Sequence, residues 1–165
     1  MFMSFSEENQ SILDGLTDTI GKDNVYDVKT PKPRKAYIRI NVEKLRDAVT
    51  YLKEKHGFYH LAAITGMDLG DEREVVYHLN KPGLLLSVKV RVAGDNAVVP
   101  SITGIINGAT LYEREIHDII GVTPEGHTNL KRVHLPEDWP EGIYPLLKKW
   151  DVKSLRKAID GEEWT

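Results

Sequence analysis

The alternation of apolar and polar residues predicts two helices in the first third of the chain. Apolar side chains recur at helical intervals within residues 5–20 and 42–52, and a glycine ends each pattern. Ser4 and Glu7 have the spacing of a capping box at the first pattern, and Asn41 can cap the second. We therefore expect two amphipathic helices, each with one face turned toward a core.

Short runs of β-branched and apolar residues lie between and after these helices, and they predict strands. Val88, Val90 and Val92 alternate with Lys89 and Arg91, as expected of a sheet with one face in water. Turn residues separate the last three runs, which predicts an antiparallel meander. The expected fold class is α+β, with an antiparallel or mixed sheet that helices cover on one face. The predicted strands are 25–28, 36–40, 58–69, 75–79 and 84–92.

Residues 111–121 predict a third helix, and two of its acids lie beside its apolar stripe. At about 100° per residue, the stripe consists of Tyr112, Ile116, Ile119 and Ile120. Glu113 and Glu115 flank this stripe. The residues that point away from it are Arg114, His117 and Asp118. Carboxylates beside a core need partners, because desolvating a lone charge costs several kcal/mol.

Helical and strand periodicity is lost from Val122 to Trp150. This stretch is rich in proline and carries too many apolar residues for a flexible linker. We expect extended chain laid on a surface, either its own or a partner's. The cations expected to pair with the acids of the third helix are Lys131, Arg132, Lys148 and Lys149.

Two shorter helical segments are expected on either side of these elements, at 100–108 and at 151–161. The residues expected on the inner face of the second are Val152, Leu155 and Ile159. The predicted organisation is an α+β domain at 1–121 followed by an extended, proline-rich segment at 122–165, which we call the tail.

Composition is that of an ordinary globular chain and excludes several partners and cofactors. The 165 residues are 41% apolar and 28% charged, and the net charge of −3 gives no general attraction to nucleic acid. The absence of cysteine excludes disulfides and cysteine-ligated zinc or iron–sulfur clusters, and fits a reducing compartment. No apolar run approaches the roughly 20 residues that span a bilayer. We expect a cytoplasmic protein without a direct membrane span.

One set of side chains suggests metal chemistry. Glu113 and His117 share a helix face, and His127 or His134 could fold back onto them. Such a set could bind zinc or iron and make the chain a stand-alone metal-dependent enzyme. A helix-surface pair with hydrogen bonds from a loop explains the same residues more simply. The sequence has no serine-nucleophile motif and no phosphate-binding loop, so the residues alone do not indicate a catalyst.

An ordered series of residues from the third helix into the tail carries a specific resemblance. The series is Glu113-Arg114-Glu115, Asp118, Gly121, His127, Leu130, Lys131-Arg132 and Leu135-Pro136-Glu137-Asp138-Trp139. It resembles the signature of the 30-kilodalton subunit, also called the C subunit, of proton-pumping NADH:quinone oxidoreductase (respiratory complex I). Membrane-bound nickel–iron hydrogenases and similar ion-pumping complexes contain a related subunit. The resemblance covers residues 108–150.

The resemblance implies a non-catalytic structural subunit in the hydrophilic arm of a membrane-bound, ion-pumping oxidoreductase complex. Such a subunit holds no cofactor or metal and packs against the large subunit that forms the quinone or nickel–iron site, and against neighbouring iron–sulfur subunits. Its implied location is the cytoplasmic face of the cell membrane, with the tail docked on these partners. Carried over by position, the residues that anchor or guide the tail are Glu113, Arg114, Glu115, Asp118, His127, Lys131, Arg132, Pro136 and Trp139.

The end of the matched stretch departs from the family pattern. Ile143 is an additional residue, Leu147 stands where the family has arginine, and Lys149 stands where it has an acid. His134 occupies a position that is more often apolar. These departures, together with the short chain, favour the hydrogenase-like branch over a classical NADH-linked enzyme.

Overall fold

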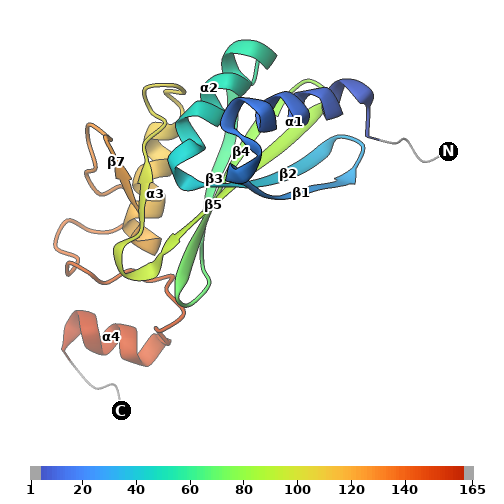
Figure 1. Ribbon diagram of the computed structural model, residues 1–165. Helices are drawn as coiled ribbons and strands as arrows, with labels where there is room; N and C mark the ends of the chain where they lie inside the picture. The colour runs from blue at the N-terminus through green and yellow to red at the C-terminus, as the bar shows by residue number, and fades with distance from the viewer. Residues whose placement is uncertain (1–4, 162–165) are drawn as a thin grey trace.

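The computed structural model describes residues 5–161 and contains four α-helices, seven strands and three short 3₁₀ turns within that range (Figure 1). The helices are α1 (Glu7–Ile20), α2 (Leu45–His56), α3 (Ala109–Ile120) and α4 (Val152–Asp160). The strands are β1 (Val25–Lys32), β2 (Lys35–Ile40), β3 (His60–Asp68), β4 (Glu72–Lys81), β5 (Leu84–Ala93), β6 (Val98–Pro100) and β7 (Thr123–Glu125). The 3₁₀ turns are Lys22–Asn24, Val42–Lys44 and Gly94–Asn96.

The main sheet is mixed, with the strand order β1-β2-β5-β4-β3. Strands β3, β4 and β5 form the antiparallel meander that the sequence predicted, whereas β2 pairs with β5 in parallel. The register places Ile38, Val88, Tyr77 and Ile64 in one row across four strands. All four side chains are buried, so this row lies on the face that the core covers. The predicted α+β class with a mixed sheet is confirmed.

Helices α1, α2 and α3 cover the face of the sheet that carries this buried row (Figure 1). Helices α1 and α2 pack against each other, and α3 packs against β3. The approach of α3 to the sheet depends on Gly66, because a Cβ there would lie only 3.2 Å from a side-chain carbon of Ile120. The opposite face is polar, in agreement with the alternation of valine and basic residues in β5.

Several local expectations differ from the structure. The cap of α1 is Ser6, whose side chain accepts a hydrogen bond from the Asn9 N–H, while Ser4 lies outside the described residues. Residues 100–108 form no helix: β6 ends there and pairs in parallel with β7 of the tail. Pairing with β7 holds Pro100 in an extended conformation, and hydrogen-bonded turns follow from Ile102 to Ala109. Helical periodicity cannot reveal a long-range partner such as β7.

Helix α4 forms where the sequence predicted a last helix, but none of its residues is buried. Asp151 caps it through a reciprocal pair of hydrogen bonds with Ser154. Val152 was expected to face inward together with Leu155 and Ile159, yet it is 71% exposed, whereas Leu155 and Ile159 are half-buried. Figure 1 shows α4 apart from the sheet and its covering helices. None of the helices in the described residues is long and apolar enough to cross a membrane.

Candidate docking site

Helix α3 ends at Gly121, where the chain turns back to begin the tail. Gly121 has φ +72°, and its N–H donates to the carbonyl of His117. Only glycine fits at this position, because a Cβ would lie 2.4 Å from the ring of Tyr144. The tail therefore returns directly onto the end of the helix that precedes it.

Glu113 points into the body of the protein, away from the tail. It is fully buried, and its carboxylate accepts hydrogen bonds of 2.7 Å from the Ser101 hydroxyl and the Ile102 N–H. Burial raises the pKa of Glu113, although both hydrogen bonds favour the ionised form. The expected pairing with tail cations is not what the structure contains, because the loop before α3 supplies the donors at shorter range.

Arg114 holds the tail through backbone carbonyl groups. Its Nε donates to the carbonyl of Lys131 at 2.6 Å, and its Nη2 donates to the carbonyl of Arg132 at 2.9 Å. Lys131 and Arg132 therefore meet α3 through their main chain. Hydrogen bonds from a charged group are stronger than neutral ones, so this contact fixes the path of the tail.

Asp118 makes the reciprocal contact, with a carboxylate that accepts from the tail. Its Oδ2 accepts hydrogen bonds from the N–H groups of Val133 at 2.6 Å and His134 at 3.0 Å. Asp118 is only 4% exposed, although the helical pattern placed it on a face directed away from the core. The tail covers this face as a second layer, and a helical wheel contains no information about such a layer.

Glu115 has a looser contact with the tail. Its carboxylate lies 3.7 Å from Nε2 of His134, and both side chains are more than one-third exposed. Exposed pairs of this kind contribute about 0–1 kcal/mol. The two acids that flank the apolar stripe thus have different surroundings, one fully buried and the other at the surface.

His117 and His127 each hydrogen-bond to backbone groups. Nδ1 of His117 lies 3.2 Å from the carbonyl oxygen of Val122. Nδ1 of His127 accepts from the Asn129 N–H at 3.0 Å, so its Nε2 carries the proton that is donated to the Thr110 carbonyl at 3.2 Å. His127 therefore ties the start of the tail to the first turn of α3.

The structure does not assemble the metal site that these histidines suggested. Glu113 is engaged by the loop before α3, and both imidazole rings are engaged by backbone groups. Among residues 5–161 no group of three histidine, aspartate or glutamate side chains is placed to hold a metal ion. The described structure therefore does not bring Glu113, His117 and His127 together as a metal site.

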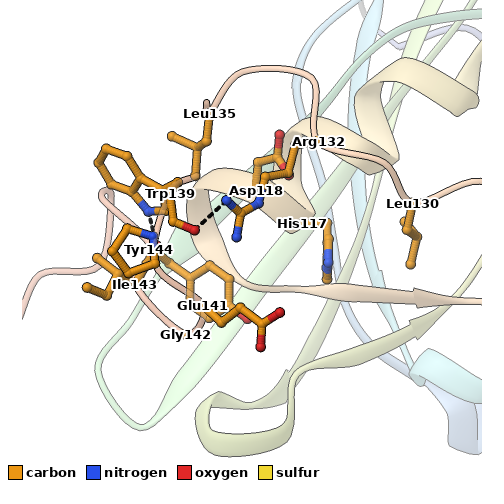
Figure 2. A pocket seen from close by; sticks show the side chains of 11 residues that line it. His117, Asp118, Leu130, Arg132, Leu135, Trp139, Glu141, Gly142, Ile143 and Tyr144 are labelled. Atoms are coloured by element: carbon orange, nitrogen blue, oxygen red, sulfur yellow. Dashed lines mark hydrogen bonds between the residues drawn. The ribbon is translucent and has the colours of Figure 1, made fainter. Parts of the chain in front are cut away.

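Arg132 and Trp139 organise the middle of the tail into a compact loop. Nη1 of Arg132 donates to the carbonyls of Pro136, Glu137 and Trp139 at 2.5–3.2 Å. The indole N–H of Trp139 donates to the Ile143 carbonyl at 2.8 Å. Figure 2 shows Arg132 directed toward Trp139 over the end of α3. Pro136 takes part through its carbonyl, and its ring leaves no N–H to be satisfied.

Two residues of the β3–β4 hairpin also hold the tail, and the sequence patterns pointed to neither. Asp68 Oδ2 accepts from the Lys148 N–H at 2.7 Å, and hydrogen bonds from Gly70 and Lys148 lower the pKa of Asp68. Arg73 donates to the Gly121 carbonyl at 2.6 Å, and its guanidinium lies 5.8 Å from the ring centre of Tyr144. An acid and an arginine beside a turn look like ordinary turn residues, so no local signal distinguishes them.

A hollow of about 320 Å³ lies between α3 and the folded tail (Figure 2). Its lining includes His117, Asp118, Arg132, Trp139, Glu141 and Tyr144. Beyond the hollow the tail presents apolar side chains outward, with Val133 39% and Leu146 58% exposed. The arrangement combines a main chain fixed to α3 with apolar side chains that remain exposed.

Comparison with known proteins identifies the family. The model of the family described as respiratory-chain NADH dehydrogenase, 30 Kd subunit, matches residues 38–156. The chain belongs to this family, and the resemblance seen in residues 108–150 is confirmed.

Individual relatives come from both branches of the family. The C subunit of NADH-quinone oxidoreductase from Moorella thermoacetica is 41% identical over 119 residues, which are 70% of this chain and 79% of the relative. The beta subunit of the membrane-bound hydrogenase from Pyrococcus furiosus is 32% identical over 126 residues, which are 72% of this chain and 73% of the relative. The chain is thus a subunit of the NADH-quinone oxidoreductase or membrane-bound hydrogenase type.

Solved structures agree with this assignment. A chain of the membrane-bound sulfane sulfur reductase, an archaeal respiratory membrane complex, superposes with a TM-score of 0.78 at 28% identity. That match covers 92% of this chain and 91% of the other. A trypsin-resistant fragment of Nqo5 superposes with a TM-score of 0.60 at 23% identity, which shows a shared fold.

Proposed function

We propose that this chain is a non-catalytic structural subunit in the hydrophilic arm of a membrane-bound, ion-pumping oxidoreductase complex. In this proposal it scaffolds the large subunit that forms the quinone or nickel–iron site, on the cytoplasmic face of the cell membrane. The observation that carries the proposal is the tail fixed to α3 by Arg114 and Asp118, with apolar side chains directed outward.

The proposal assigns no cofactor to this chain. The sequence has no cysteine, the residue that most often ligates iron–sulfur clusters. Iron–sulfur clusters and the quinone or nickel–iron site then belong to the partner subunits. The chain contributes a rigid α+β body and a shaped surface.

Docking through the tail is supported by the different surroundings of its backbone polar groups and its apolar side chains. The carbonyl groups of residues 131 and 132 and the N–H groups of residues 133 and 134 are already bound by α3, so binding a partner does not have to desolvate these four groups. The exposed apolar side chains of Leu146 and Val152 remain available for burial. Interfaces of obligate complexes typically bury more than about 2,000 Å². We therefore expect the partner to cover the whole tail, including α4.

The variant Leu146→Glu tests this proposal. A charge in the centre of an apolar contact is costly to bury, so a tagged variant expressed in the host should lose at least tenfold of its copurifying large subunit. Tyr59→Glu is the matched control, because Tyr59 is 69% exposed on the loop after α2. Circular dichroism should show the same melting temperature for both variants. An intact complex with Leu146→Glu would refute docking through the tail.

A further inference from the structure

The face of the main sheet that none of the described helices covers carries an excess of positive charge. The strand register places six cations on it: Lys29, Lys32, Lys35, Arg39, Lys89 and Arg91. The acids on the same face are Asp27, Glu72 and Glu74. The chain as a whole has a net charge of −3, so this face has the opposite sign to the rest of the molecule.

The acids of this face are all engaged by its own cations. Glu74 is almost completely buried, and its carboxylate lies 2.8 Å from Nε of Arg91 and 3.4 Å from Nζ of Lys89. Burial opposes ionisation of Glu74, but Arg91 and Lys89 together outweigh it and lower its pKa. Glu72 lies 3.6 Å from Arg91, and Asp27 lies 3.2 Å from Lys29.

Lys35 and Arg39 remain without an acidic partner among residues 5–161. Lys35 lies over the ring of Tyr37 at 5.2 Å, and Arg39 lies over the ring of Tyr26 at 5.1 Å. Cation–π contacts of this kind stabilise both side chains in place. The face thus contains two fixed, uncompensated cations.

His78 lies on the same face as these cations. Its ring lies on β4 between Ser87 at 2.9 Å and Thr65 at 3.3 Å. Burial lowers the pKa of His78, and the charges of Lys35 and Lys89 lower it further.

Two hollows that share lining residues lie on this face of the sheet. One of about 240 Å³ is lined by residues that include Tyr37, Lys89 and Glu74, and one of about 220 Å³ by residues that include Tyr26 and Val42. Both are lined by Arg39 and Arg91, whereas Lys35 lies on the same face of the sheet and lines neither hollow. We call this surface the cationic groove.

We propose that the cationic groove is a second docking surface, which receives an acidic segment of a partner protein. Carboxylates of such a segment would pair with Arg39 in the groove and with Lys35 beside it, and its apolar side chains would lie against the tyrosine rings. Electrostatic complementarity of this kind fixes register and partner choice. The proposal goes beyond docking through the tail and does not depend on it.

A polypeptide fits the groove better than nucleic acid or an anionic lipid surface. The groove contains the carboxylates of Asp27 and Glu72, which repel a continuous row of phosphates. Its aromatic and aliphatic walls need apolar partners, which a phosphate backbone does not offer. A flat bilayer also cannot fill two concave hollows. A polypeptide segment with mixed acidic and apolar side chains can pair with the cations, contact the apolar walls and enter the hollows.

Site-specific photocrosslinking tests the proposal. The full-length chain is expressed in its host with benzoylphenylalanine at position 29, where the Lys29 side chain is 70% exposed at the border of the groove. Position 59 is the control, because Tyr59 is equally exposed but lies outside the groove. Mass spectrometry should identify one cross-linked partner peptide from position 29, with a net negative charge and no counterpart from position 59.

Charge variants then decide whether the contact is electrostatic. The double variant Lys35→Gln and Arg39→Gln should reduce the cross-link at least tenfold, and raising salt from about 0.05 M to about 1 M should weaken it in the unaltered groove. Reversing an acid of the captured peptide to lysine, together with Arg39→Glu, should restore it. The proposal is overturned by no cross-link, by a cross-link to lipid or nucleic acid, by a neutral or basic peptide, or by indifference to salt and to the double variant. Leu146→Glu leaves this cross-link unchanged if the rest of the complex assembles through the groove.

Discussion

Asp118 and Glu115 show that the surroundings of an acid determine how strongly it can hold the tail. Both are acids of α3 separated by less than one helical turn, and both were expected to anchor the tail. Asp118 is buried and accepts two backbone N–H groups at hydrogen-bond distance, whereas Glu115 only faces His134 at 3.7 Å across exposed surface. The energetic role of an acid depends on whether its loss leaves a buried donor without a partner.

Asp118→Ala is expected to release the tail locally. The N–H groups of Val133 and His134 would lose their acceptor, which costs about 1–3 kcal/mol. Amide hydrogen exchange at these two positions, measured by NMR, should accelerate roughly tenfold or more, because about 1.4 kcal/mol is a factor of ten.

The matched variant Glu115→Gln should change exchange at the same amides by less than about threefold, because an exposed pair contributes at most about 1 kcal/mol and often much less. Equal acceleration in both variants would mean that Asp118 is not the anchor. Unchanged exchange in Asp118→Ala would mean that the tail leaves the helix in solution.

At the scale of elements, α2 and α3 end in the same way but face different neighbours. Gly57 and Gly121 both follow a helix, and both have φ +72°. A Cβ at Gly57 would lie 3.6 Å from the ring of Tyr59, an ordinary contact, but at Gly121 it would lie 2.4 Å from the ring of Tyr144. A substitution at Gly57 therefore tests the cost of the backbone conformation alone, whereas the same substitution at Gly121 also tests the packing of the tail.

Gly57→Ala should lower the free energy of unfolding by about 1–2 kcal/mol, the cost of a left-handed conformation for alanine. Gly121→Ala should cost this amount plus about 1–3 kcal/mol for the overlap with Tyr144. Urea denaturation measures both. In the Tyr144→Ala background the additional cost should disappear, since the overlapping ring is gone. Equal effects of the two glycine variants in the unaltered chain would contradict the packing of the tail against α3.

At the scale of the whole molecule, the chain consists of a well-packed body and an end that packs on little of it. The core joins α1, α2 and α3 to the main sheet, whereas α4 buries no residue. Its apolar positions include Val152, which is 71% exposed. A helix of this length is marginal in water without tertiary contacts, so the docking proposed above would stabilise it by burying this side chain.

A chain that ends at Trp150 tests this division of roles. Its free energy of unfolding should change by less than about 0.5 kcal/mol, as for other changes at exposed positions. Its incorporation into the complex should fall at least tenfold, because the apolar face of α4 is missing from the interface. Thermal and chemical denaturation and copurification with the large subunit measure the two effects. A loss of more than about 1 kcal/mol in the isolated chain would show that α4 packs on its own body.

Local patterns in the sequence predicted the elements whose stability comes from near neighbours. Periodicity and terminal glycines placed α1, α2 and α3, and alternation placed the antiparallel meander with its polar outer face. The series from Glu113 to Trp139 identified the family, which the family model confirmed. The division of the chain at residue 121 and the preference for the hydrogenase-like branch stay predictions.

The tertiary structure alone decided which residues meet across long distances in the chain. It paired β2 with β5 and β6 with β7 in parallel, joined Glu113 to Ser101, and brought Asp68 to Lys148. The physical reason is that the tail is held mainly by backbone N–H and carbonyl groups, which every residue except proline carries alike. Side-chain identity therefore marks Arg114 and Asp118 as charged, but only the folded chain determines which backbone groups they bind.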